Sequence, residues 1–369
     1  MGEESILFIG SLNREAPSFK RAKGKGIAAY RFDLDSGEAT LAGETAGIDN
    51  PSYLTVHPSN GCLYATSEVF GWNEGTVTTY RFDRASGRLI YLNKQPTLGS
   101  MPAYCSIDRT GRFLLVANYA IGPLDDLPGK SVAILPIRGD GGVDPAAASA
   151  AHSGSGPNRA RQERSHAHCI MASPDNRTVV VADLGIDSLV SYRFDAKTGT
   201  ILPGAATGLA AGAGPRHFAF HPDGTKAFVI NELDSTIHAL AYDAASGGFS
   251  VLDSVSALSD GDHVESHCAS IQISPDGRFI YGANRGHNSI VIYEVDQASG
   301  KLTLVGLEST RGATPRDHVI DPTGRFLLVC NQDADRVVIF RRDAATGRLS
   351  DTGKPIETGT PMCAKFAMG

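Results

Sequence analysis

The fold is decided by residues 214–224, Gly-Pro-Arg-His-Phe-Ala-Phe-His-Pro-Asp-Gly, together with residues 226–232, Lys-Ala-Phe-Val-Ile-Asn-Glu. Pro-Asp-Gly is a turn sequence, because Pro presets φ and Gly accepts a positive φ. The apolar runs on either side are typical of strands. The stretch therefore predicts a strand, a tight turn and a second strand, with Arg216 near the entry and Glu232 at the exit.

The same strand–turn–strand pattern recurs at constant register along the chain. We call its copies the inner hairpins, and they span residues 51–68, 102–119, 167–184, 215–232, 268–285 and 315–332. A second type of hairpin follows each inner one. Six copies are marked by an aromatic residue, often with Arg-Phe-Asp, and then by Ser-Gly or Thr-Gly, and a weaker copy lies at residues 135–142. Seven such outer hairpins stand against six inner ones, so one inner hairpin is missing.

The missing inner hairpin is split between the two ends of the chain. Residues 5–11 read as a second inner strand with nothing before it, and residues 360–366 read as a first inner strand with nothing after it. A repeat of about 50 residues with four antiparallel strands is typical of a β-propeller blade. We therefore predict an all-β, seven-bladed β-propeller that forms a single domain over residues 1–369, with one blade closed by both terminal strands. The alternative is an open sandwich or a two-domain β protein.

One interval between repeats is longer than the others. The excess lies in residues 139–165, which are rich in Gly, Ala, Ser and Pro and end in a basic segment at 158–164. Long loops in compact folds are lids, binding loops or disordered segments. We expect this insert near the central opening, with disorder in its Ala-Ser-Gly part and a lid as a possible role for its basic end.

Propeller geometry brings particular residues together. The start of each first inner strand and the end of each second one lie on the same face, opposite the turns. The residues at these positions differ from blade to blade, as expected of a binding site. The polar ones are Ser52, Glu68, Tyr119, His168, Arg216, Glu232, Arg285, Arg316 and Gln332. Asn recurs just before the strand end, at 118, 231, 284 and 331, so we expect it to cap loops instead of binding a ligand.

Histidines lie close to the same face. His166 and His168 share one side of a strand, and His217 and His267 lie beside other strand starts. A His-x-His pair could begin a metal site, but no third ligand adjoins it. We predict neither a metal nor a cofactor, since no P-loop, dinucleotide-binding or nucleophile-elbow motif is present.

Composition excludes several classes of partner. The chain has a formal net charge of −6 and no basic block, so nucleic acid and anionic membranes are poor candidates. No run of about 18 apolar residues suggests a membrane span. No signal peptide is recognised and the six cysteines are scattered, which favours the cytoplasm and buried thiols. We expect a monomer or a small homo-oligomer that acts on a small molecule.

The motifs at 214–224 and 229–235 resemble the lactonase family of seven-bladed propellers. That family includes the propeller type of 6-phosphogluconolactonase and carboxy-cis,cis-muconate cyclase. Further matches are His166-Ala167-His168 and Ala283-Asn284-Arg285, and the likeness runs over residues 6–365. The resemblance implies a site made of His168, Arg216, Glu232 and Arg285, without a metal. Each of these four residues already belongs to the set derived from register.

The resemblance predicts hydrolysis of a sugar-acid lactone, such as 6-phosphogluconolactone or a related aldonolactone. Ring opening needs a base for water and fixed positive charge for the oxyanion. We expect Glu232 to be the base, Arg216 and Arg285 to hold the carbonyl oxygen or a substrate anion, and His168 to be the general acid. Residues expected to bind substrate are His166, Arg316, Glu68, Tyr119, His217 and His267.

Two alternative functions stay open. One is carboxymuconate cycloisomerase activity, in which the same arginines would bind carboxylates. The other is a non-catalytic propeller that binds carbohydrate or protein. That reading predicts an aromatic or hydrophobic face, whereas Tyr119 is the only aromatic residue in the set.

Overall fold

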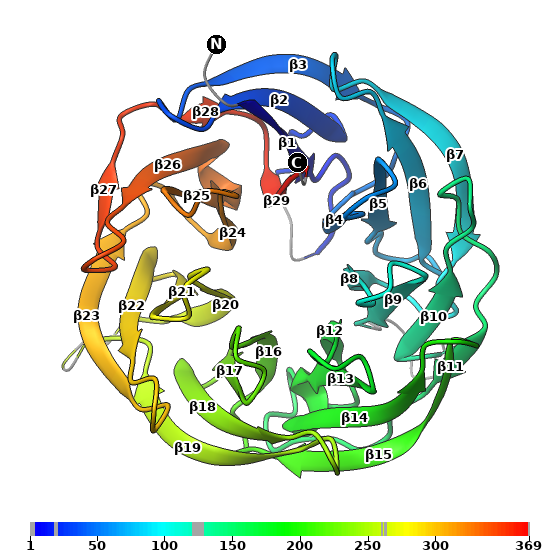
Figure 1. Cartoon of the computed structure of the whole chain (residues 1–369), viewed down its shortest axis with the longest axis vertical. Coiled ribbons are helices and arrows are strands. Elements are labelled where there is room, and N and C mark those ends of the chain that lie inside the picture. The colour runs from blue at the N-terminus through cyan, green and yellow to red at the C-terminus, as the bar shows by residue number, and fades with distance from the viewer. Residues whose placement is uncertain (1–3, 18–20, 120–128, 260, 262–263, 368–369) are drawn as a thin grey trace.

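Seven antiparallel sheets surround one central axis in the computed structural model of the chain (Figure 1). The structure describes residues 4–17, 21–119, 129–259, 261 and 264–367. Six sheets have four strands and one has five, because its outermost strand is in two pieces. The predicted seven-bladed propeller is confirmed. Blades are numbered here in the order of the six complete inner hairpins, and the split blade is blade 7.

The first four blades follow the chain in order. Their strands are, for blade 1, β4 (Leu54–Val56), β5 (Cys62–Ser67), β6 (Thr76–Phe82) and β7 (Leu89–Pro96); for blade 2, β8 (Pro102–Ile107), β9 (Phe113–Asn118), β10 (Val132–Pro136) and β11 (Ala148–Ala150); for blade 3, β12 (Ala167–Ala172), β13 (Thr178–Asp183), β14 (Ser188–Asp195) and β15 (Thr200–Gly208); and for blade 4, β16 (Pro215–Phe220), β17 (Lys226–Asn231), β18 (Thr236–Asp243) and β19 (Gly248–Ser256).

The remaining blades complete the ring. Their strands are, for blade 5, β20 (His267–Ile273), β21 (Phe279–Arg285), β22 (Ser289–Val295) and β23 (Leu302–Ser309); for blade 6, β24 (Pro315–Ile320), β25 (Phe326–Asn331), β26 (Arg336–Arg342), β27 (Leu349–Asp351) and β28 (Ile356–Glu357); and for blade 7, β29 (Pro361–Phe366), β1 (Glu4–Ser11), β2 (Ile27–Asp33) and β3 (Ala39–Thr45). Two 3-10 turns, η1 (Leu184–Ile186) and η2 (Gln332–Ala334), follow β13 and β25.

Blade 7 closes the ring with strands from both ends of the chain. β29 pairs antiparallel with β1, and the register places Ile9 opposite Ala364 and Leu7 opposite Phe366. Figure 1 shows this blade with blue strands from the N-terminal end beside the red strand from the C-terminal end. The predicted split blade is therefore confirmed.

The turn of each inner hairpin follows from its sequence. In blade 4 the Gly224 N–H donates to the His221 carbonyl oxygen at 2.9 Å, which closes a tight turn around Pro222 and Asp223. Gly224 has a φ of +74°, a conformation that glycine adopts without strain. Asn176, with a φ of +59°, replaces the glycine in blade 3, as Asn tolerates this region best among residues with a side chain.

A β-bulge recurs where the inner hairpins approach the central opening. In blade 4, Pro215 pairs with Asn231 and His217 with Ile230, so Arg216 is an extra residue on its strand. The same shift isolates the residue after the first strand position in three other blades, namely Ala103, His168 and Arg316. A bulge bends its strand and redirects a side chain. It thus changes the direction of three of the side chains predicted to form the site.

The core lies between neighbouring blades. Every residue of the second inner strands β5, β9, β13, β17 and β25 is buried, whereas the outer strands β3, β7 and β19 are largely exposed or intermediate. Burial of apolar area at about 25 cal/mol per Å² makes these interfaces the main source of stability. All six cysteines are buried and free, as predicted.

The interpretation of residues 139–165 as one insert was wrong in its first half. Ala148–Ala150 forms β11, the fourth strand of blade 2, and a bridge joins Ile137 to Val143. A blade needs this outer strand to cover β10, so this part of the segment is blade structure. Only the following residues lead to the central opening.

Three of the four recurrent asparagines hold loops, as predicted, whereas Asn231 donates to the Thr236 hydroxyl at 2.8 Å. The Asn284 side-chain amide donates to the Ala257 carbonyl oxygen at 2.7 Å, and that of Asn331 donates to the Thr310 carbonyl oxygen at 2.9 Å. Asn118 makes two such bonds. Each of these three side chains is buried and ties the end of a second inner strand to a neighbouring loop.

Replacing Asn284 with alanine should destabilise the fold, because it leaves the buried Ala257 carbonyl without its donor. The expected loss in the free energy of unfolding is about 1–3 kcal/mol. Urea denaturation measures it. The exposed Ser350→Ala variant serves as control and should change stability by less than about 0.5 kcal/mol. Equal stability of the two variants would contradict a capping role.

Candidate active site

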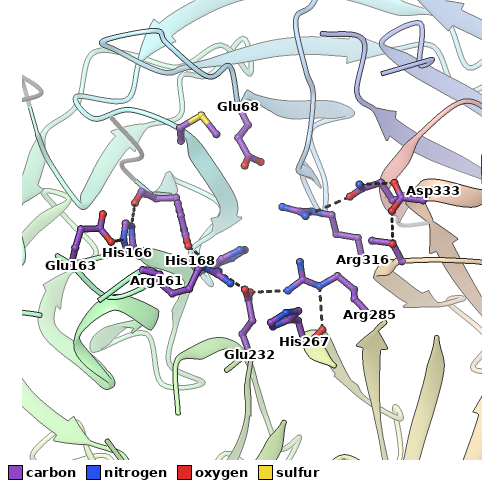
Figure 2. A pocket seen from close by; sticks show the side chains of 15 residues that line it. Glu68, Arg161, Glu163, His166, His168, Glu232, His267, Arg285, Arg316 and Asp333 are labelled. Carbon is purple, nitrogen blue, oxygen red and sulfur yellow. Dashed lines mark hydrogen bonds and ion pairs between the residues drawn. The ribbon is translucent and has the colours of Figure 1, made fainter. Parts of the chain in front are cut away.

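A cavity of about 490 Å³ opens at the end of the channel where the inner hairpins start and finish. Its volume lies in the range of small-molecule sites. Figure 2 shows its charged side chains converging on one space. The lining residues are Glu68, Met101, Tyr119, Ala160, Arg161, Glu163, His166, His168, Glu232, His267, Arg285, Thr314, Arg316, Gln332 and Asp333.

Glu232 is the centre of a buried charge cluster. It follows β17 and is only 3% exposed. Its Oε2 lies 3.0 Å from Arg216 Nε and 2.8 Å from Arg285 Nη2, and its Oε1 accepts a hydrogen bond from Arg161. Both carboxylate oxygens are therefore engaged by guanidinium groups.

These ion pairs fix the protonation state of Glu232. Burial alone would raise the pKa of this carboxyl, but the positive charges of Arg285, Arg161 and Arg216 outweigh burial and hold the pKa well below its usual range. Burial and the charges of Arg285 and Arg316 lower the pKa of Arg216. A guanidinium nevertheless stays charged in proteins. The cluster is thus one anion shared among three cations.

Arg161 is a site residue that the sequence analysis did not assign. It comes from the segment between β11 and β12, where its Nη2 also lies 3.2 Å from the Tyr119 hydroxyl. In the same segment, Glu163 contacts His166 Nε2 at 3.1 Å. The basic run at 158–164, just before an inner strand, was the available signal. It fixed neither which arginine enters the cavity nor its partner.

His168 reaches the cavity from the bulge of β12. Burial lowers the pKa of its imidazole well below 6.5, and the charges of Arg216 and Arg316 lower the pKa further. Its Nδ1 is buried without a hydrogen-bond partner among the described residues. His168 is therefore neutral near pH 7. His166, which stacks on Tyr119 at 4.5 Å between ring centroids, is held by its contacts to Glu163 and the Tyr119 carbonyl.

Glu68 enters the cavity from the opposite side, just after β5. It is 5% exposed, and its backbone is fixed by two hydrogen bonds with Asn50, each 3.1 Å long. Burial raises the pKa of its carboxyl, against the opposing charges of Arg316 and Arg216. Glu68 and Glu232 occupy equivalent positions in their hairpins, yet their environments differ.

The other predicted residues divide into cavity and channel positions. Arg316 and His267 line the cavity, and Arg316 lies 3.4 Å from Gln332 Oε1. Arg216 lies behind Glu232, outside the cavity lining. His217 also lies deeper in the channel, with its ring centroid 5.1 Å from that of Tyr104. A role for His217 in substrate binding stays a prediction.

The described residues contain neither a cluster of metal ligands nor a membrane-spanning helix. No group of three or more His, Cys, Asp or Glu side chains there is placed to hold a metal ion. No helix in this part of the chain is long and apolar enough to cross a bilayer.

Comparisons with known proteins agree with the fold. The family model described as lactonase, 7-bladed β-propeller, matches residues 6–366. The 6-phosphogluconolactonase of Bacillus subtilis (strain 168) is 38% identical over 301 residues, which are 81% of this chain and 82% of that protein. A protein of the same name from Formosa agariphila is 35% identical over 85% of this chain and 86% of its own length. The solved structure of the periplasmic gluconolactonase of Pseudomonas aeruginosa is 33% identical, superposes with a TM-score of 0.89 and covers 99% of both chains.

Glu232→Gln should destabilise the protein, because it leaves Arg161, Arg216 and Arg285 close together without their anion. Removing one partner of a buried ion pair costs about 3–5 kcal/mol. Urea denaturation at pH 7 measures this loss, with Glu294→Gln on the exposed outer face as control.

The loss should depend on pH in a defined direction. The folded pKa of Glu232 is depressed, so its stabilisation is fully present above its unfolded pKa of about 4.3 and disappears as pH falls through the folded pKa. The difference between wild type and Glu232→Gln should therefore be constant from pH 5 to 7 and shrink only in stronger acid. A difference that shrinks already between pH 7 and 5 would contradict the charge cluster.

Proposed function

The chain belongs to the lactonase family of seven-bladed β-propellers, and we propose that it hydrolyses a sugar-acid lactone in the cavity around Glu232 and Arg285. The relatives named 6-phosphogluconolactonase and gluconolactonase support a lactone hydrolase. The observation that carries the assignment is the arginine cluster, which presents fixed positive charge inside a cavity large enough for one sugar ring.

The arginines suit the charge that develops in lactone opening. Attack of water on the lactone carbonyl produces a tetrahedral oxyanion, which preorganised donors stabilise. Arg285 lines the cavity, and its position is fixed by hydrogen bonds to the His267 and Cys268 carbonyl oxygens at 3.2 and 3.1 Å. We assign Arg285 to the oxyanion or to the carboxylate that forms from it. Arg316, across the cavity, is suited to a second anionic or hydroxyl group of the sugar acid.

The environment of Glu232 argues against its expected role as base. Its Oε1 accepts a hydrogen bond from Arg161 and its Oε2 is ion-paired with Arg216 and Arg285, and its depressed pKa makes it a weak proton acceptor. We propose instead that Glu232 positions Arg161, Arg216 and Arg285. The neutral state of His168 likewise argues against an imidazolium acid. We propose that neutral His168 orients water or substrate by hydrogen bonding.

Purified protein should open 6-phosphogluconolactone or an unphosphorylated aldonolactone well above the spontaneous rate. A pH-stat assay compares both lactones, and a carboxymuconate serves as the substrate of the alternative cyclase reaction. Activity should be unchanged after treatment with a chelator, because the proposed mechanism uses no metal. Cyclisation of the muconate without opening of any lactone would contradict the proposal. Cytoplasmic location stays a prediction, since one relative is described as periplasmic.

Arg285→Ala should lower kcat by about 10²–10³-fold, the usual effect of removing one oxyanion donor. Arg285→Lys keeps the charge but loses the planar fork, so it should recover only part of the rate. Arg216→Ala should show a comparable loss, because Arg216 shares Glu232 with Arg285. Unfolding curves establish that each variant is folded. Activity like that of wild type in folded Arg285→Ala would contradict the assignment.

A further inference from the structure

The cavity holds two buried glutamates in unlike surroundings. Glu232 is bound by three arginines. The Glu68 carboxylate points into the cavity (Figure 2), forms no close ion pair among the described residues, and has the Ser52 side chain as its hydrogen-bonding neighbour. Because no arginine among the described residues forms an ion pair with it, the Glu68 carboxylate can still accept a hydrogen bond from a substrate or from water. Two carboxyl groups whose surroundings push their pKa values apart commonly take different roles in catalysis.

We propose that Glu68 is the general base of the lactone-opening reaction, taking a proton from the attacking water and returning it to the ring oxygen. This inference rests on the proposed lactonase function but assigns its proton transfer to a different residue. Three observations carry it: a carboxylate without a close ion pair among the described residues, its fixed backbone, and its position at the border of a second, smaller space.

Two hydrogen bonds with Asn50 fix the backbone of Glu68 at the point where its side chain enters the cavity. Asn50 donates from Nδ2 to the Glu68 carbonyl oxygen and accepts from the Glu68 N–H at its own carbonyl, each at 3.1 Å. Asn50 is itself 1% exposed and accepts at Oδ1 from the N–H groups of Asn13 and Arg14 at 3.0 and 2.7 Å. A buried clamp of this kind is what a residue that must meet a reacting atom requires.

A small space under the cavity floor suits the reacting water. It measures about 10 Å³, and Glu68, His168 and Asp317 border it. His168 Nδ1 and Asp317 Oδ1 are buried there without a hydrogen-bond partner among the described residues. A polar site of about this size accommodates a single water molecule. A water held by His168 at this junction would lie beside the Glu68 carboxylate.

One carboxylate can both accept and return the proton that the reaction transfers. The water oxygen bonds to the lactone carbonyl carbon while one water proton passes to ionised Glu68. The tetrahedral intermediate then breaks its bond to the ring oxygen, and protonated Glu68 delivers that proton to the departing oxygen, which becomes a hydroxyl group. The new carboxylic acid ionises to solvent, and Glu68 returns to its ionised form.

The charges that face Glu68 agree with this role. Arg216 from β16 and Arg316 from β24 face it, with neutral His168 from β12. The arginines favour the ionised form, while burial raises the pKa and makes the carboxylate a better base than one in water. Glu232 lies across the cavity with its charge compensated by its own arginines.

Kinetics of Glu68 variants test the proposal. Glu68→Gln should lower kcat at least 10²-fold, within the usual range for a general base, and change KM less than threefold. In wild type, kcat/KM should fall in acid with an apparent pKa above 4.5, and this limb should be absent in Glu68→Gln. Glu68→Ala should be rescued several-fold by formate, which can occupy the vacated position. Glu294→Gln, on the outer face, should retain wild-type rates.

Two results would overturn the inference. One is a Glu68→Gln variant that keeps more than a tenth of the wild-type kcat, and the other is an unchanged acid limb in that variant. A wild-type protein that opens no lactone would instead defeat the proposed function. In that case infrared difference spectra of wild type against Glu68→Gln still test the inference, because they follow the titration of the Glu68 carboxyl without any turnover. A Glu68 carboxyl that titrates at or below pH 4.5 would contradict its role as a base.

Discussion

The pairing of β29 with β1 is the constraint on which the rest of the molecule depends. The seven sheets enclose a common channel only if the last blade is joined to the first. Here the two ends of the chain make that connection, because β1 and β29 pair within one blade. An open arc would expose two long inner edges to solvent and to other chains. Closure removes them, and it brings residues as distant in sequence as Glu68 and Arg316 to the wall of one cavity.

Closure also determines where charge can be tolerated. The ends of the inner hairpins lie at a half-enclosed opening, and bulges there direct Arg216, His168 and Arg316 away from the regular ladder. Buried arginines require an anion, and Glu232 provides one for three of them. That carboxylate is committed to its arginines, whereas the Glu68 carboxylate has no close ion pair among the described residues. The site thus separates charge compensation from proton transfer.

The sequence predicted the architecture well because turn residues and strand ends recur at constant register. Register also placed Glu232 and Arg285 correctly at one opening. It could not reveal Arg161, which lies between repeats and has no equivalent position in other blades. Nor could it distinguish the two glutamates, since both stand at the same position of their hairpins. The two glutamates differ in their ion pairs because different neighbouring segments place arginines beside them. These contacts are visible only in the three-dimensional structure.

The most direct test of the account is a crystal structure with the open sugar acid bound. The cavity should hold the acid with its carboxylate within hydrogen-bond distance of Arg285 and with Glu68 beside the same carbon. That result would join the arginine cluster and the Glu68 carboxylate at one reacting centre. Sugar acid bound elsewhere, for example in the smaller groove beside Lys25 and Tyr30, with the central cavity holding only solvent, would contradict it.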